Sequence, residues 1–107
     1  PAALRRLGQC GVPPGELAAF LGPAVCGRHY PVGPEVIAAL ARAGVPRPAW
    51  LEGDRVELRG FLAAQLEGLG VARVAIVGPC THSTPELASY RRDGSAAGRQ
   101  WSLVWRA

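Results

Sequence analysis

Residues 78–105 read GPCTHSTPELASYRRDGSAAGRQWSLVW, and we expect this segment to organise the fold. The four residues before it, VAIV at 74–77, have the apolar, β-branched character of a buried strand. A second apolar run, at 101–105, closes the segment and predicts another strand beside the first. The polar loop between them holds four consecutive residues with ligand-binding chemistry: Tyr90, Arg91, Arg92 and Asp93. Planar guanidinium groups suit phosphate or carboxylate, although a solvated turn is the simpler interpretation.

The rest of the chain alternates helices, loops and short strands. Apolar positions at helical spacing predict three helices, over residues 2–10, 34–42 and 56–69. Two apolar runs predict strands, at 17–21 and 71–77. Asp54 is expected to cap the last helix, and Trp50 and Leu51 to pack inward. This order predicts an α+β fold of mixed α/β layers, with helices packed on a mixed sheet that is incomplete in this chain.

Composition limits the class of protein. The 107 residues suffice for one domain, and 49% apolar with 19% charged residues indicates a globular chain. All twelve basic residues are arginine, and the net charge of +4 favours an anionic ligand. The arginines are scattered, so we expect no nucleic-acid partner. With no apolar run near 18 residues and three widely spaced cysteines, we expect no membrane span, no cleaved leader and a reducing, cytoplasmic location.

Residues 22–36, GPAVCGRHYPVGPEV, predict a long irregular loop that is also a candidate site. Its Cys26 and His29, with Cys80 and His82, could form a Cys2His2 zinc site, although the single residue between Cys80 and His82 is short for such a site. Cys80 could instead be a nucleophile paired with His29 or His82. The simplest interpretation is that both cysteines are small buried residues.

Three segments together resemble the C-terminal half of the YfiH-type family in order and spacing. They are GPAVCGRHYPVGPEV at 22–36, LRGFLAAQLEGLGV at 58–71 and GPCTHSTPELASYRRDGSAAGR at 78–99. The family includes multicopper polyphenol oxidoreductases (laccase-domain proteins), purine nucleoside phosphorylases and peptidoglycan-editing factors such as PgeF. The resemblance implies an α/β sandwich enzyme that cleaves purine nucleosides with phosphate and also deaminates adenosine. The alternatives are an amidase that edits peptidoglycan precursors and a catalytically inactive binding fragment.

The resemblance also implies where the site residues lie. Tyr90, Arg91, Arg92 and Asp93, with Gly22 and Pro23, match loops that line the family's substrate pocket, so we expect them to contact nucleoside and phosphate. Cys26 and Cys80 are possible thiols near that site. The family's zinc or copper is held by a His, a Cys and a His that would lie upstream of residue 1, so we expect this chain alone to bind no metal. No catalytic residue is assigned within it.

The chain starts at Pro1, contains no methionine, and opens in a helical pattern without a capping residue. We therefore expect residues 1–107 to be the C-terminal part of one YfiH-type domain whose N-terminal part is absent, and to be inactive alone. The missing part of the domain would be its first partner. Such a fragment is expected to expose apolar surface.

Overall fold

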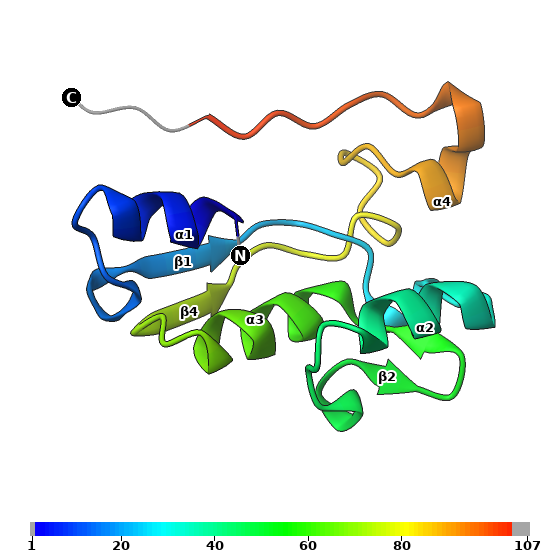
Figure 1. The fold of residues 1–107 in the computed structure, drawn as a ribbon. Coiled ribbons are helices and arrows are strands. Elements are labelled where there is room, and N and C mark those ends of the chain that lie inside the picture. Colours follow the sequence, from blue (N-terminus) through cyan, green and yellow to red (C-terminus); the bar gives the residue numbers. More distant parts are fainter. Residues whose placement is uncertain (1, 104–107) are drawn as a thin grey trace.

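The computed structural model describes residues 2–103 (Figure 1). Its helices are α1 (Ala2–Gln9), α2 (Pro34–Ala41), α3 (Leu58–Gly68) and α4 (Tyr90–Asp93). Its strands are β1 (Ala18–Leu21), β2 (Leu51–Glu52), β3 (Arg55–Val56) and β4 (Arg73–Ile76). Short 3-10 turns lie at Pro14–Glu16, Gly27–His29, Arg47–Ala49 and Gly94–Ala96. The predicted α+β class is confirmed.

None of the helices within residues 2–103 is both long enough and apolar enough to cross a lipid bilayer.

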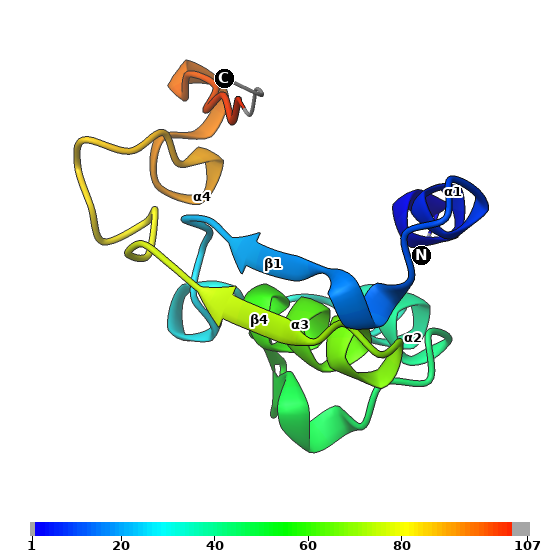
Figure 2. The same cartoon turned by 90° about the vertical axis from the view of Figure 1, so that its left-hand side faces the viewer.

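A parallel pair of strands forms the centre of the fold. β1 pairs with β4, with Ala18 opposite Arg73 and Leu21 opposite Ile76. α3 runs into β4 and packs against both strands, so that it covers one side of the pair (Figure 2). A connection between parallel strands must cross from one end of the sheet to the other, and here it contains α2, the small hairpin and α3.

The apolar core lies beside α3 and not between the strands. Val45, Trp50, Val56 and Phe61 are all buried and form one cluster. The Trp50 and Phe61 rings meet edge to face, with centroids 5.5 Å apart. The indole Nε1 of Trp50 donates a hydrogen bond to the Val45 carbonyl at 3.1 Å, which satisfies the only polar atom of that buried side chain. The expectation that Trp50 packs inward is confirmed.

The predicted start of the long helix was wrong. Asp54 and Val56 lie in an antiparallel hairpin formed by β2 and β3, and α3 begins only at Leu58. Gly53, with φ of 61°, supplies the left-handed backbone that a two-residue hairpin turn requires. The helix is capped by Glu57, whose side chain accepts a hydrogen bond from the Arg59 amide at 3.4 Å. Val56 is apolar because it packs in the core beside α3. Its spacing from the apolar residues of α3 therefore made the predicted helix begin too early.

The predicted strand at the C-terminal end was also wrong within the described residues. Residues 101–103 are irregular, and β4 pairs with β1 instead. The remainder of the prediction, residues 104–105, lies outside the described residues. The segment after α4 runs extended (Figure 1), and Trp101 and Leu103 are highly exposed.

The β1–β4 pair also carries exposed apolar side chains. Phe20 is 71% exposed and Ile76 is 50% exposed, which are high values for large apolar residues in a central sheet. Both strands are only four residues long, and within residues 2–103 each has one sheet neighbour. A two-stranded sheet is marginal alone, because each strand keeps one unpaired edge.

The core makes a direct stability prediction. Val56→Ala removes two methyl groups from a fully buried side chain, and should lower the free energy of unfolding of this chain by about 2 kcal/mol. The matched control is Val77→Ala, which makes the same change at a side chain that is 43% exposed. Urea unfolding followed by tryptophan fluorescence measures the free energy of unfolding of both variants. Equal losses for the two variants would contradict the assigned core.

Candidate functional site

The two loops that the sequence indicated meet beyond the ends of β1 and β4. Parallel strands end at the same edge of a sheet, so the loops that follow them start side by side. The pairing continues past the strands: the Val77 amide donates to the Leu21 carbonyl at 2.8 Å, and the Thr81 amide to the Ala24 carbonyl at 3.1 Å. Ala24 and Cys80 also form an isolated parallel bridge. The two loops are therefore joined through backbone hydrogen bonds.

Cys26, His29 and Cys80 come together at this junction. The 3-10 turn is closed by a hydrogen bond from the His29 amide to the Cys26 carbonyl at 2.9 Å. Side chains three residues apart lie on the same side of such a turn, and Cys26 Sγ is 3.4 Å from His29 Nδ1. Cys80 Sγ is 3.7 Å from the same nitrogen and accepts a hydrogen bond from the Cys26 amide at 3.2 Å. The three potential ligand atoms all lie within 4.8 Å of one another.

The two thiols differ in acidity. Burial raises the pKa of Cys80, but hydrogen bonds with the Cys26 amide, the His29 ring and the Cys26 thiol outweigh it and lower the pKa to about 5. Burial raises the pKa of Cys26, and its hydrogen bond with Cys80 and the negative charge of Cys80 raise it further. These opposite directions favour a thiolate on Cys80 over a thiolate on Cys26.

His82 lies next to this group but does not join it. Its ring stacks on the His29 ring, with centroids 4.2 Å apart and planes 15° apart. Residues 81–83 form a turn, so His82 does not follow Cys80 along an extended segment. The group of three possible ligands found within residues 2–103 does not include His82. The Ser83 hydroxyl also borders the group, with Oγ 3.4 Å from His29 Nδ1.

The two adjacent arginines have different surroundings. Arg92 uses its guanidinium to hold the loop: Nη1 donates to the Thr81 and Thr84 carbonyls at 2.8 and 3.0 Å, and Nη2 to the Leu87 carbonyl at 2.7 Å. Asp93 accepts from Nε at 2.9 Å and from Nη2 at 2.8 Å. These bonds use all five N–H donors of the guanidinium. Arg92 has no donor left for a ligand in this structure.

The side-chain hydrogen bonds described within residues 2–103 include Arg92 but not Arg91. The Arg91 guanidinium carbon lies 4.6 Å from the centre of the Tyr30 ring, in a cation–π contact. The side chain is exposed, and the ion pairs described within residues 2–103 do not include it. A cavity of about 660 Å³ lies beside this contact. It is lined by Val25, Tyr30, Leu58, Thr81, Ala88, Ser89, Tyr90 and Arg91.

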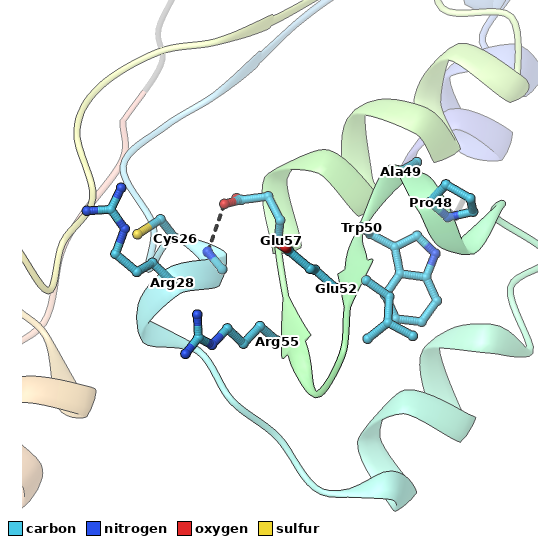
Figure 3. Close-up of a pocket in the computed structure, with 10 residues that line it drawn as sticks. Cys26, Arg28, Pro48, Ala49, Trp50, Glu52, Arg55 and Glu57 are labelled. Atoms are coloured by element: carbon cyan, nitrogen blue, oxygen red, sulfur yellow. Dashed lines mark hydrogen bonds between the residues drawn. The ribbon is translucent and has the colours of Figure 1, made fainter.

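A second cavity, of about 440 Å³, is lined in part by residues 26–28 of the 3-10 turn at Gly27–His29 (Figure 3). Arg28 and Arg55 stand at one end of it and Trp50 at the other. The Glu57 carboxylate accepts a hydrogen bond from the Gly27 amide at 2.8 Å, drawn as the dashed line. Glu57 therefore fixes the turn that presents Cys26 while it also caps α3.

Gly22 and Pro23 lie at the base of the junction. Both are exposed, and Pro23 packs on Gly78, where an added Cβ would come within 2.7 Å of the proline ring. Gly78 also has φ of 87°, so only glycine suits this crossing. Contact of Gly22 and Pro23 with a substrate stays a prediction. The same holds for residues 90–93.

Three residues that shape the site were not among those predicted from the sequence. Glu57 lies 30 residues from Gly27, so no local signal linked them. Thr81 is buried at the loop junction, and its carbonyl is the first partner of Arg92. Tyr30 follows His29 directly, and an aromatic residue in a glycine-rich loop near arginines was an available signal for a cation–π contact.

The acidity of Cys80 can be tested by alkylation. In protein treated with a chelator, Cys80 should react with iodoacetamide faster than the exposed Cys10 at pH 7, because the Cys80 thiol is already ionised. Its rate should fall as the pH drops through about 5. Peptide mass mapping separates the sites. A Cys80 rate that increases only above pH 8, as for an ordinary thiol, would contradict the geometry.

Comparison with known proteins shows the family of this chain. Residues 1–107 match the family model described as multi-copper polyphenol oxidoreductase laccase. The chain is 37% identical to a purine nucleoside phosphorylase of Streptomyces coelicolor over 98% of its own length and 44% of that protein. It is 36% identical to one of Deinococcus radiodurans, covering 88% of the chain and 38% of that protein. It is 43% identical to one of Mycobacterium tuberculosis, covering 84% and 36%.

The chain thus spans about two fifths of the length of these relatives. No solved structure gave a significant match. The family model matches every residue, so the chain belongs to the multi-copper polyphenol oxidoreductase laccase family.

Proposed function

We propose that the protein containing this chain is a purine nucleoside phosphorylase and that residues 22–30 and 78–93 form one wall of its substrate site. The observation that carries the proposal is the identity of 36–43% to relatives of that name over at least 84% of the chain. These names favour phosphorolysis over the amidase alternative. The activity belongs to a longer protein, because each relative is more than twice as long as the region matched.

Phosphorolysis sets two requirements for the wall. A phosphate oxygen forms a bond to C1′ of the ribose, the bond from C1′ to the purine nitrogen breaks, and the purine leaves with the electron pair and takes up a proton. The site must therefore hold a phosphate dianion next to a flat, apolar base. Arginine supports the first requirement and exposed aromatic rings support the second.

The cavity of about 660 Å³ offers both kinds of group. Arg91 stands at its edge with free N–H donors, and its position is fixed by the ring of Tyr30. Tyr90 is 69% exposed on the same helix and lines the same cavity. We assign phosphate binding to Arg91 and base or ribose contact to Tyr90 and Tyr30. Arg92, paired with Asp93, is a positioning residue that holds the loop.

We also propose that residues 1–107 are the C-terminal part of a single laccase-type domain. The exposed side chains on the β1–β4 pair, Phe20 and Ile76, support this, because further strands and helices of the same domain would cover them. The zinc or copper implied by the family resemblance would be held by His and Cys residues of the other part. Adenosine deamination is a second reaction that the resemblance implies for the whole protein.

The two arginines give a paired test in the whole protein. Arg91→Gln should raise the KM for phosphate by about 10-fold or more, since a hydrogen-bonded charge is lost, and should leave the Tm unchanged. Arg92→Gln should lower the Tm, because the carbonyls of Thr81, Thr84 and Leu87, and the more distant carbonyl of His82, lose their donor. Phosphate-dependent release of hypoxanthine from inosine measures the kinetics, and thermal unfolding measures the Tm.

Two results would count against these assignments. Turnover of inosine that does not depend on phosphate would contradict the proposed reaction. Normal phosphate KM in Arg91→Gln, with the reaction otherwise present, would leave the activity intact but remove Arg91 from the phosphate site.

A further inference from the structure

The group formed by Cys26, His29 and Cys80 has the ligand types and the spacing of a zinc site. Zinc binds thiolate sulfur at about 2.3 Å and imidazole nitrogen at about 2.0–2.1 Å in tetrahedral sites. Those lengths place a sulfur and a nitrogen ligand about 3.6 Å apart. The two distances from His29 Nδ1, 3.4 Å to Cys26 Sγ and 3.7 Å to Cys80 Sγ, lie on either side of that value.

The backbone holds these three ligand atoms in place. Cys26 and His29 are presented from one 3-10 turn, which Glu57 fixes through the Gly27 amide. Cys80 is brought to them by its parallel bridge with Ala24. A metal site needs such preorganisation, because ligands left free to move would lose conformational entropy on binding.

The surroundings also suit a thiolate–metal centre. The Cys26 amide donates to Cys80 Sγ at 3.2 Å, which stabilises negative charge on the sulfur. The His29 ring is held by its stacking on His82, so the nitrogen facing the sulfurs keeps its direction. Ser83, an exposed residue, borders the same nitrogen at 3.4 Å and marks the side from which a fourth ligand can enter.

We propose that Cys26, His29 and Cys80 bind one zinc ion, with the fourth position open to water or to a substrate atom. Two sulfurs and one imidazole favour zinc over magnesium or calcium, which prefer oxygen. Binding of the ion releases the Cys26 proton, after which two thiolates and a neutral imidazole balance the charge of the ion. This site goes beyond the proposed function and does not depend on it, and it revises the expectation from the sequence that the chain alone binds no metal.

The position of the site gives it a role in the fold. It joins the loop after β1 to the loop after β4, next to Val25, Tyr30 and Thr81 of the larger cavity. A metal bridge across two loops restricts their separation, as a disulfide would. Zinc binding should therefore stabilise the wall that carries Arg91.

The experiment compares metal content in the whole protein, where the other part of the domain can hold a metal of its own. Cys80→Ser and His29→Gln should each contain about one zinc per chain less than the matched control Cys10→Ser, whose thiol is exposed and lies outside the group. Zinc is measured by elemental analysis, and circular dichroism verifies that each variant is folded. Equal zinc content in folded Cys80→Ser and Cys10→Ser would overturn the proposal.

A second measurement needs no variant. In chelator-treated wild-type protein, added Zn²⁺ should protect Cys26 and Cys80 from alkylation and leave Cys10 reactive. Co²⁺ in place of Zn²⁺ should give the thiolate-to-cobalt absorption and the visible bands of a tetrahedral site, and both should weaken in Cys80→Ser. Unchanged alkylation of Cys80 with zinc present, or a Cys26–Cys80 disulfide in the freshly purified protein, would contradict the assignment.

Discussion

The site depends on the parallel pairing of β1 and β4 and on its continuation beyond both strands. The hydrogen bond from the Thr81 amide to the Ala24 carbonyl extends the ladder into the loops. Because both strands run the same way, both loops emerge at one edge. That geometry places Cys80 against Cys26 although 54 residues separate them. Had the strands been antiparallel, the two loops would have opened at opposite ends of the sheet.

A loop that pairs with no strand must find other hydrogen-bond donors for its backbone carbonyl groups. Between residues 81 and 87 the chain turns repeatedly, and Arg92 supplies the donors that a neighbouring strand would otherwise provide. Asp93 neutralises the charge, and its carboxylate raises the pKa of Arg92 further above the ordinary value. One side chain therefore replaces several backbone pairings, which explains how an irregular segment can present functional groups in fixed positions.

Local patterns in the sequence predicted local structure well. Helices close to α1 and α2 and strands close to β1 and β4 followed from apolar spacing, and the α+β class followed from their order. The pairing of β4 with β1 was missed, because strand partners depend on distant contacts. The cysteine–histidine group was considered with both His29 and His82, but the structure brings only His29 close to both sulfurs, and His82 stacks on the His29 ring beside the turn at 81–83. The spacing of two residues does not show whether they lie in an extended segment or in a turn.

The pair of adjacent arginines shows why sequence alone could not separate their roles. Neighbouring residues on a helix point about 100° apart, so a short helix over Tyr90–Asp93 must turn one guanidinium toward the loop and the other away. Arg92 takes the inward position and loses every donor to backbone and carboxylate oxygens. Arg91 takes the outward position over Tyr30 and keeps its donors. A four-residue helix is thus enough to make one arginine a structural residue and leave the other available for an anion.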